Sequence, residues 1–257
     1  MKVSVLTNNF NGSKNIDSFF KSLYAQSFVD WELIFFDNNS TDNSIELVNN
    51  YKIKDGRIKL FKNDQFTGLG LARSKALNLC NSDYIAVWDI DDTADKDRLE
   101  VQYNFLNSNT DIDLVCSNVI KLTNGKSYNY YINPSSEYIK SQLVWHNIIV
   151  HSSVMYKKEI ALKIGGYDPN YNYSQDYNFY INFLINNYKI SSIDKYLCYQ
   201  SINNDGLSMQ KNMKKTIYLD QINNLIKARK IKKIKFVSKF LNYVATYYYL
   251  VRILFVK

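Results

Sequence analysis

Short apolar segments alternate with amphipathic ones through residues 1–120, and this alternation limits the possible folds more than any other feature of the chain. The apolar segments have the length of buried strands; they are Val3–Leu6, Trp31–Phe36, Arg57–Phe61, Tyr84–Trp88 and Asp113–Ser117. Between them, apolar residues recur at helical spacing, as in Lys14–Gln26 and Gly70–Cys80. Strands that alternate with helices predict βαβ units and a mostly parallel sheet. Because the strands are apolar throughout, we expect helices on both faces, which is a Rossmann-like α/β architecture.

Polar residues predict where two further helices begin. Ser40 is expected to be the N-cap of a helix that carries Val48, and Asp95 the N-cap of a helix that carries Leu99. Both residue types accept hydrogen bonds from the free N–H groups of a first helical turn.

The second half of the chain has a looser pattern. We expect a strand at Ile148–Tyr156 and helices at Lys158–Ile164 and Gln175–Asn187, with helix again from Lys211 onward. No linker, repeat or low-complexity segment interrupts the chain. We therefore expect one domain over residues 1–210, followed by a basic and aromatic helical tail over residues 211–257.

Charge and cysteine content narrow the classes of partner and compartment. The formal net charge of +8 favours an anionic partner, which leaves a nucleotide, an anionic lipid surface or a nucleic acid open. The three cysteines are far apart and form no CxxC pair, which argues against a disulfide framework and suits a reducing cytosol. The apolar run at the N-terminus is too short for a signal peptide. The sequence also has no run of about 20 uncharged apolar residues, the length that a membrane-spanning helix needs.

Polar side chains follow three of the expected strands where each strand ends. These ends are Thr7-Asn8-Asn9, Asp37-Asn38-Asn39 and Asp89-Ile90-Asp91. In open α/β sheets, ligands bind beyond the carboxyl ends of the strands. The pair Asp89 and Asp91 suits Mg²⁺ or Mn²⁺ held against a diphosphate, and the cation would relieve the repulsion between the carboxylates. The alternative is that these acids only close a turn and cap the next helix.

Five motifs, taken together, resemble the family 2 glycosyltransferases of GT-A fold, of the bacterial surface-glycan type. They occur in the order typical of that family and cover roughly residues 2–190: VSVLTNNFNGSKNI, QSFVDWELIFFDNNSTDNS, GLGLARSKAL, YIAVWDIDDTADKDRLE and GGYDPNYNYSQDYNFYINFL. The resemblance implies a nucleotide-sugar-binding half over residues 1–120 and an acceptor half over 121–210.

The first two motifs would bind the base of the donor. Phe10 stands where the family usually has Tyr, and its ring can stack on uracil. Asn8 lies within reach of the base or ribose. Asn38 replaces the second acid of the commoner DDGSTD form, and its amide can still accept from uracil N3–H and donate to O4. The replacement leaves dTDP-sugars open beside UDP-sugars.

The next two motifs would bind the diphosphate, the sugar and the metal. Arg73 can neutralise phosphate charge, although a solvated surface arginine is the alternative. By the resemblance, Asp89 contacts the ribose or donor sugar and joins Asp91 at a Mn²⁺ or Mg²⁺ ion. We expect Asp92 to be structural.

The last motif carries the residue expected to perform the chemistry. The family usually has Glu-Asp where this chain has Gln175-Asp176, and the resemblance makes Asp176 the catalytic base. Without the neighbouring acid, Asp176 is expected to be a weaker base. The alternative is an acid that only favours the first turn of a helix.

Two histidine features complete the expected site. His151 is assigned a donor contact, although a lone histidine on an apolar strand is more often a satisfied core residue. Many family members have a metal-binding histidine after a late strand, but the corresponding stretch at residues 199–208, YQSINNDGLS, has none. We therefore expect fewer protein ligands to the metal.

The tail has two interpretations. Its lysine cluster followed by aromatic and aliphatic residues suits an interfacial helix on an anionic membrane. Alternatively, the helix packs on the domain with its lysines outward. Nucleic-acid binding is disfavoured, because no RNA- or DNA-binding module is present.

The sequence therefore predicts a metal-dependent, inverting glycosyltransferase. It would move a hexose or N-acetylhexosamine from a UDP-sugar or dTDP-sugar to a glycan or lipid-linked saccharide, in the cytoplasm or at the inner face of its membrane. Two alternatives stay open: a catalytically silent nucleotide-sugar-binding module, and a nucleotidyltransferase. The second usually needs a basic, glycine-rich loop after the first strand, where this chain has one Gly and one Lys.

Overall fold

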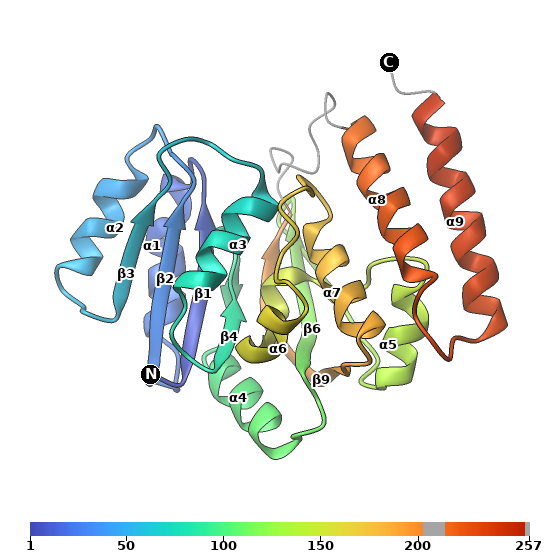
Figure 1. Ribbon diagram of the computed structural model, residues 1–257. Helices are drawn as coiled ribbons and strands as arrows, with labels where there is room; N and C mark the ends of the chain where they lie inside the picture. The colour runs from blue at the N-terminus through green and yellow to red at the C-terminus, as the bar shows by residue number, and fades with distance from the viewer. Residues whose placement is uncertain (203–213, 255–257) are drawn as a thin grey trace.

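A computed structural model describes residues 1–202 and 214–254, and its centre is a nine-stranded mixed sheet with helices on both faces (Figure 1). The strand order is β3-β2-β1-β4-β8-β6-β9-β5, and β7 pairs with β6 outside this path. The strands are β1 (Val3–Asn9), β2 (Trp31–Asp37), β3 (Ile58–Lys62), β4 (Tyr84–Val87), β5 (Thr93–Ala94), β6 (Leu114–Thr123), β7 (Lys126–Tyr130), β8 (Met155–Lys157) and β9 (Ile190–Ser201).

Two parallel blocks meet at one short antiparallel strand. Strands β3, β2, β1 and β4 run parallel, as the alternating pattern predicted. Strand β8 is antiparallel to both β4 and β6, and β9 is parallel to β6. The carboxyl ends of β1, β2 and β4 therefore share one edge of the sheet, which is where the polar strand ends were expected to gather.

Helices cover both faces, each over its own apolar cluster. One cluster is packed by α1 (Ile16–Tyr24), α2 (Ser44–Lys52) and α4 (Arg98–Ser108). The opposite cluster is packed by α3 (Leu69–Leu79), α5 (Ser136–Leu143), α6 (Lys158–Lys163) and α7 (Gln175–Ile185). The expected α/β class with helices on both faces is confirmed.

Three local expectations were wrong. The helix after Ser40 begins at Ser44, and its N-cap is Asn43 rather than Ser40. The Ser40 hydroxyl instead donates to Asp37. Helix α4 begins behind Asp97, and the carboxylate of Asp95 accepts from the Asp97 N–H. The expected strand at Ile148–Tyr156 is strand only from Met155, because a 3₁₀ turn occupies His151–Ser153.

The C-terminal segment is helical, as expected, in α8 (Lys214–Ala228) and α9 (Phe236–Leu254). Helix α8 packs between α7 and α9 (Figure 1). The expected boundary at residue 210 and the onset of helix at Lys211 lie outside the described residues. None of the helices in the described part of the chain combines the length and the apolar character that a membrane span requires.

Candidate active site

A cavity of about 730 Å³ opens at the shared carboxyl edge of β1, β2 and β4. Six of the residues assigned to donor or metal binding line it: Asn8, Phe10, Asn38, Arg73, Asp89 and Asp91. The sequence also contributes residues that were not foreseen, among them Lys14, Phe66 and Thr216. The motifs thus converge on one cavity because parallel strands bring their ends together.

Asn8 faces this cavity with an unused amide. Among the described residues, neither its Nδ2 nor its Oδ1 has a hydrogen-bond partner, although both atoms are buried. The neighbouring Asn9 differs, because its amide donates to Asp37 and to Ser40. A buried amide without a partner costs free energy unless a ligand completes it, so Asn8 is poised for a polar ligand group.

Asn38 lines the same cavity but is occupied by its own loop. Its Nδ2 donates to the Thr67 carbonyl at 2.7 Å. Its Oδ1 accepts from the Thr67 N–H and hydroxyl and from Asn63 Nδ2. The side chain therefore holds the loop between β3 and α3, and its expected contact with a base stays a prediction.

An aromatic pair stands at the mouth of the cavity. The rings of Phe10 and Phe66 lie 4.6 Å apart at an interplanar angle of 53°, and both side chains are exposed. Two exposed rings beside a polar cavity offer an apolar face to a planar ligand. Phe66 was missed in the sequence because a lone Phe in a polar loop carries no periodic signal.

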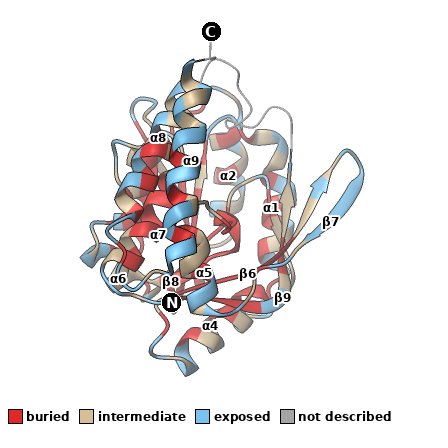
Figure 2. Ribbon diagram, turned by 90° about the vertical axis from the view of Figure 1, so that its right-hand side faces the viewer, coloured by how far each residue is buried: buried red, intermediate tan, exposed pale blue. Residues whose placement is uncertain are grey.

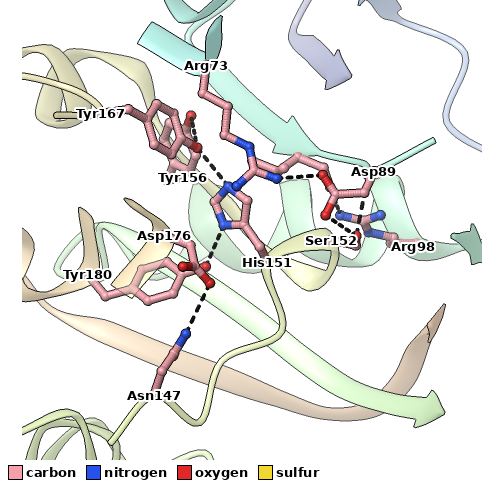
Figure 3. Close-up of polar contacts among 11 residues, drawn as sticks. Arg73, Asp89, Arg98, Asn147, His151, Ser152, Tyr156, Tyr167, Asp176 and Tyr180 are labelled. Atoms are coloured by element: carbon pink, nitrogen blue, oxygen red, sulfur yellow. Dashed lines mark hydrogen bonds and ion pairs between the residues drawn. The ribbon is translucent and has the colours of Figure 1, made fainter. Parts of the chain in front are cut away.

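Arg73, which is buried, and Asp89, which is partly exposed, form an ion pair at the inner end of the cavity. Arg73 Nη2 lies 2.7 Å from Asp89 Oδ1, and the Ser152 hydroxyl donates to Asp89 Oδ2 at 3.0 Å (Figure 3). Burial alone would lower the pKa of Arg73, but Asp89 and other neighbours raise it overall, so the guanidinium stays charged. Its Nε is buried without a partner among the described residues, so it can still receive an anion.

Asp91 and Asp92 differ in what surrounds them. Asp91 lines the cavity, and burial together with the nearby charge of Asp89 raises its pKa. Asp92 is buried away from the cavity, accepts from the Ser201 N–H, and has a pKa raised by burial to about 8. This geometry agrees with the expected structural part for Asp92.

A second cavity of about 310 Å³ adjoins the first. Both are lined by Leu69, Arg73 and Asp89, and the second is also lined by His151, Gln175 and Asp176. Lys121 and Gln200 add polar groups from the sheet side. The Arg73–Asp89 pair therefore stands where the two cavities meet.

Asp176 lies in the first turn of α7 and faces the second cavity. Asn147 Nδ2 donates to its Oδ2 at 3.1 Å (Figure 3). Burial raises the pKa of the Asp176 carboxyl, and the charge of Arg73 partly offsets this rise. The neighbouring Gln175 Oε1 is buried without a partner in the described chain. The expected weakening of Asp176 by loss of an adjacent acid is thus opposed by burial.

His151 is held on both sides by tyrosine hydroxyls. Its Nδ1 lies 2.6 Å from Tyr180 Oη and its Nε2 lies 3.1 Å from Tyr167 Oη. Burial, and secondarily the charge of Arg73, lowers the pKa of His151 well below its usual value. The imidazole is therefore neutral, and it lines the second cavity rather than the first. Its expected donor contact stays a prediction.

Helix α8 anchors the turn before Asp176. Asn224 Nδ2 donates to the Ser174 carbonyl at 3.0 Å, and Gln221 Nε2 donates to the Ser174 hydroxyl at 2.8 Å. Ser174 has a left-handed backbone with φ of 46°, which a non-glycine residue adopts only when its surroundings hold it. Asp220 accepts from the Tyr173 N–H. Contacts from α8 therefore fix the segment that presents Asp176.

Comparison with known proteins identifies the family. The sequence model described as "Glycosyl transferase family 2" matches residues 4–165. An uncharacterized glycosyltransferase, MJ1057, of Methanocaldococcus jannaschii is 31% identical over 227 residues, which cover 84% of this chain and 76% of that protein. The chain belongs to glycosyl transferase family 2. It is therefore a glycosyltransferase, and the resemblance carried by the five motifs is confirmed.

Solved structures place this family 2 enzyme in the GT-A fold. TarS of S. aureus in complex with UDP-GlcNAc has a TM-score of 0.70 and 18% identity, over 98% of this chain and 82% of TarS. The mannosyltransferase PcManGT of Pyrobaculum calidifontis, in complex with GDP-Man and Mn²⁺, has a TM-score of 0.72 and 16% identity, over 96% and 69% of the two chains.

Two carboxylates of this glycosyltransferase are placed where a divalent cation could bind together with substrate phosphates. No group of three or more His, Cys, Asp or Glu side chains that could hold a metal occurs within residues 1–202 and 214–254. Asp89 and Asp91 nevertheless line one cavity. Burial raises the pKa of Asp91, and the charge of Asp89 adds to this rise, so a bound cation would relieve the second cause. Mg²⁺-type ions commonly bind one or two carboxylates plus substrate phosphates. The stretch without histidine, residues 199–208, lies mostly outside the described residues.

Proposed function

We propose that this enzyme is a metal-dependent, inverting glycosyltransferase that uses a UDP-sugar or dTDP-sugar. It moves a hexose or N-acetylhexosamine to a hydroxyl of a glycan or lipid-linked saccharide. The observation that carries the proposal is the pair of adjoining cavities. The first has the free amide of Asn8, the second has the carboxyl of Asp176, and the Arg73–Asp89 pair stands between them. Such an arrangement suits a donor in one cavity and an acceptor in the other, with the new glycosidic bond formed where the cavities adjoin.

The first cavity is proposed to hold the donor. Phe10 and Phe66 pack on the base, and Asn8 pairs with its polar edge or with the ribose. Asn38 shapes this subsite by holding the loop at Thr67. The guanidinium of Arg73 lies against the diphosphate, and Asp89 orients both Arg73 and the sugar.

Asp91, with Asp89, would hold a Mn²⁺ or Mg²⁺ ion in the same cavity. The bound ion would neutralise diphosphate charge and so make the nucleoside diphosphate a better leaving group. Both carboxylates are available for such an ion, because Asp89 and Asp91 line the donor cavity.

The second cavity is proposed to hold the acceptor. Asp176 accepts the proton of the attacking hydroxyl, whose oxygen forms a bond to the anomeric carbon. The bond from that carbon to the diphosphate oxygen breaks, and Arg73 stabilises the negative charge that develops there. One displacement from the opposite side inverts the anomeric centre. Asn147 keeps the Asp176 carboxylate directed toward the cavity, and Gln175 Oε1 can accept from a second acceptor hydroxyl.

A catalytically silent nucleotide-sugar-binding module is the second candidate. The observation that favours it is the closed set of hydrogen bonds at Asn38, together with Gln175 in place of the usual acid. Such a module would bind a donor and release no nucleoside diphosphate. The nucleotidyltransferase alternative loses its support, because the chain belongs to a glycosyltransferase family.

Donor hydrolysis in the presence of Mn²⁺ tests the proposal. Full-length enzyme is expected to release UDP or dTDP from its sugar nucleotide, and Asp91→Asn is expected to abolish the release. Asp176→Asn should keep donor affinity and lose transfer to saccharide acceptors. Asp83→Asn, at the opposite end of β4 and exposed, is the matched control and should behave as wild type. Tight donor binding without turnover would favour the silent module, and equal loss of binding and transfer in Asp176→Asn would exclude a base.

The proposed place of action is the cytoplasm or the inner face of its membrane. All three cysteines are free and buried, as a reducing compartment permits. The division into a donor half over 1–120 and an acceptor half over 121–210 is likewise proposed, and the residues that line the two cavities support it only in part. Arg73 and Asp89 from the first half line both cavities, and Thr216 beyond residue 210 lines the donor cavity.

A further inference from the structure

Helix α9 packs on the protein through a polar stripe. The residues of α9 that are buried are Ser238, Asn242 and Thr246, which follow one another at intervals of one helical turn. Asn242 Nδ2 donates to the carbonyls of Val144 and Leu225, and Arg229 donates to Asn242 Oδ1 and to the Thr246 hydroxyl. Beside the stripe, the partly buried Tyr249 packs against Tyr218 of α8, with ring centroids 5.7 Å apart. Hydrogen bonds thus hold α9 against the domain.

The opposite face of α9 is aromatic and aliphatic, and it is exposed. Figure 2 shows this helix coloured largely as exposed along its length. Phe240 is 58% exposed and Tyr247 is 69% exposed. Six of the exposed apolar residues lie at helical spacing and so form one continuous face, which we call the α9 apolar face: Phe240, Tyr243, Val244, Tyr247, Leu250 and Leu254. An amphipathic helix of a soluble domain normally buries such a face.

Cations border this face at the end where α9 begins. Lys232, Lys233, Lys235 and Lys239 are all exposed there, and Phe236 beside them is 81% exposed. Residues 221–257 contain nine Lys or Arg residues and no Asp or Glu. The segment therefore presents apolar surface and unopposed positive charge side by side.

From this pattern we infer that the α9 apolar face and its lysine cluster dock on an anionic lipid surface. Apolar side chains that enter the acyl boundary, with lysines at the headgroups, are the features of an interfacial helix. Tyrosine, which is frequent in this helix, suits the boundary because its ring is apolar and its hydroxyl polar. Helix α9 does pack on the domain, as one interpretation of the tail expected, but its apolar face is exposed.

A second copy of the chain fits this surface less well. If two α9 helices paired through their apolar faces, parallel or antiparallel, the cations of one tail would meet no acidic residue of the other. Like charges that face each other destabilise an interface. Lipid headgroups such as phosphatidylglycerol supply the missing negative charge. The proposal does not depend on the donor or acceptor assigned above.

Co-sedimentation with vesicles tests the inference. The full-length protein should bind phosphatidylcholine vesicles that contain phosphatidylglycerol and bind pure phosphatidylcholine vesicles far less. The triple variant Lys232→Gln/Lys233→Gln/Lys235→Gln should lose roughly 100-fold in affinity, because each lysine near an anionic surface contributes about fivefold. The double variant Phe240→Ser/Tyr247→Ser should lose binding to both kinds of vesicle.

Matched controls separate this docking from charge in general. The triple variant Lys52→Gln/Lys54→Gln/Lys59→Gln removes equal charge from exposed positions near β3 and should bind as wild type. All variants should keep the wild-type melting temperature and donor hydrolysis, because α9 lines neither cavity. Equal binding by the two lysine triples would overturn the inference. So would a concentration-dependent dimer, abolished by Phe240→Ser/Tyr247→Ser, in a protein that ignores vesicles.

Discussion

Gly70, in the first turn of α3, lies where no side chain fits. A Cβ atom at this position would come within 2.4 Å of the Asp168 carbonyl oxygen and 2.5 Å of the Tyr171 carbonyl oxygen. Both are backbone atoms, so neither can rotate away. The Gly70 N–H also donates to the Tyr171 carbonyl at 3.2 Å. Gly70→Ala must therefore push α3 away from the segment that leads to α7.

The cost can be worked from these contacts. Overpacking of this kind destabilises by about 1–3 kcal/mol, and the better helix propensity of alanine returns less than about 1 kcal/mol. A net loss of about 1–2 kcal/mol lowers the melting temperature of a chain this long by roughly 2–8 °C. Gly56→Ala is the control, because its Cβ would meet no atom within 4 Å. Its stability should change by less than about 0.5 kcal/mol.

Circular-dichroism melting of both variants checks the stability, and donor hydrolysis checks the function. Arg73 lies on α3 one turn after Gly70 and lines both cavities, so displacement of α3 should also raise KM for the sugar nucleotide in Gly70→Ala. If Gly70→Ala melts and turns over donor as Gly56→Ala does, then the close packing at the start of α3 does not set the position of Arg73.

Three further predictions concern α7 and α8. Because burial raises the pKa of Asp176, and a base must be deprotonated, the acid limb of kcat/KM for transfer should lie above the ordinary aspartate value of about 3.9; a limb at or below that value would refute the proposed environment. Burial raises the pKa of Asp220 from 3.8 to about 6, so the neutral form favours folding, and wild type should lose melting temperature as the pH rises through 6. The melting temperature of Asp220→Asn should not fall over this pH range, because the amide oxygen still accepts from the backbone and does not titrate. If the melting temperatures of wild type and variant change with pH in the same way, this prediction is contradicted. Asn224→Leu should cost about 2 kcal/mol and reduce transfer more than donor binding, whereas Asn223→Leu, on the exposed side of α8, should do neither; equal effects would refute anchoring by α8.

The strand ends could be predicted because their signal is local. Short apolar runs such as Tyr84–Val87 are typical of the buried strands of an α/β sheet. Parallel pairing of these strands then brings Asn8, Asn38 and Asp89 to one edge. The family resemblance added Asp176, which no local pattern links to that edge. The proximity of the strand ends could be predicted from topology, because the carboxyl ends of neighbouring parallel strands lie at the same edge of the sheet.

The missed residues are those whose role depends on a distant partner. Ser152 matters because its hydroxyl reaches Asp89, which is 63 positions away in the sequence. The apolar run at Ile148–Tyr156 predicted a strand, but the segment turns at His151, where two tyrosines bind the imidazole. Tertiary hydrogen bonds of this kind override the propensity of the residues for strand.

The contacts of the C-terminal helices with the site could not be predicted from the periodicity of the sequence. Pattern alone treats residues 211–257 as an appendage, since they follow the last motif. Yet Asn224 and Gln221 hold the left-handed turn at Ser174 from outside the motif that contains Asp176. Such a turn stays in place only if its surroundings maintain it, so the presentation of the proposed base depends on α8. Because α9 is held in turn by Arg229, which directly follows α8, the two helices would connect the proposed lipid surface to the turn that presents Asp176.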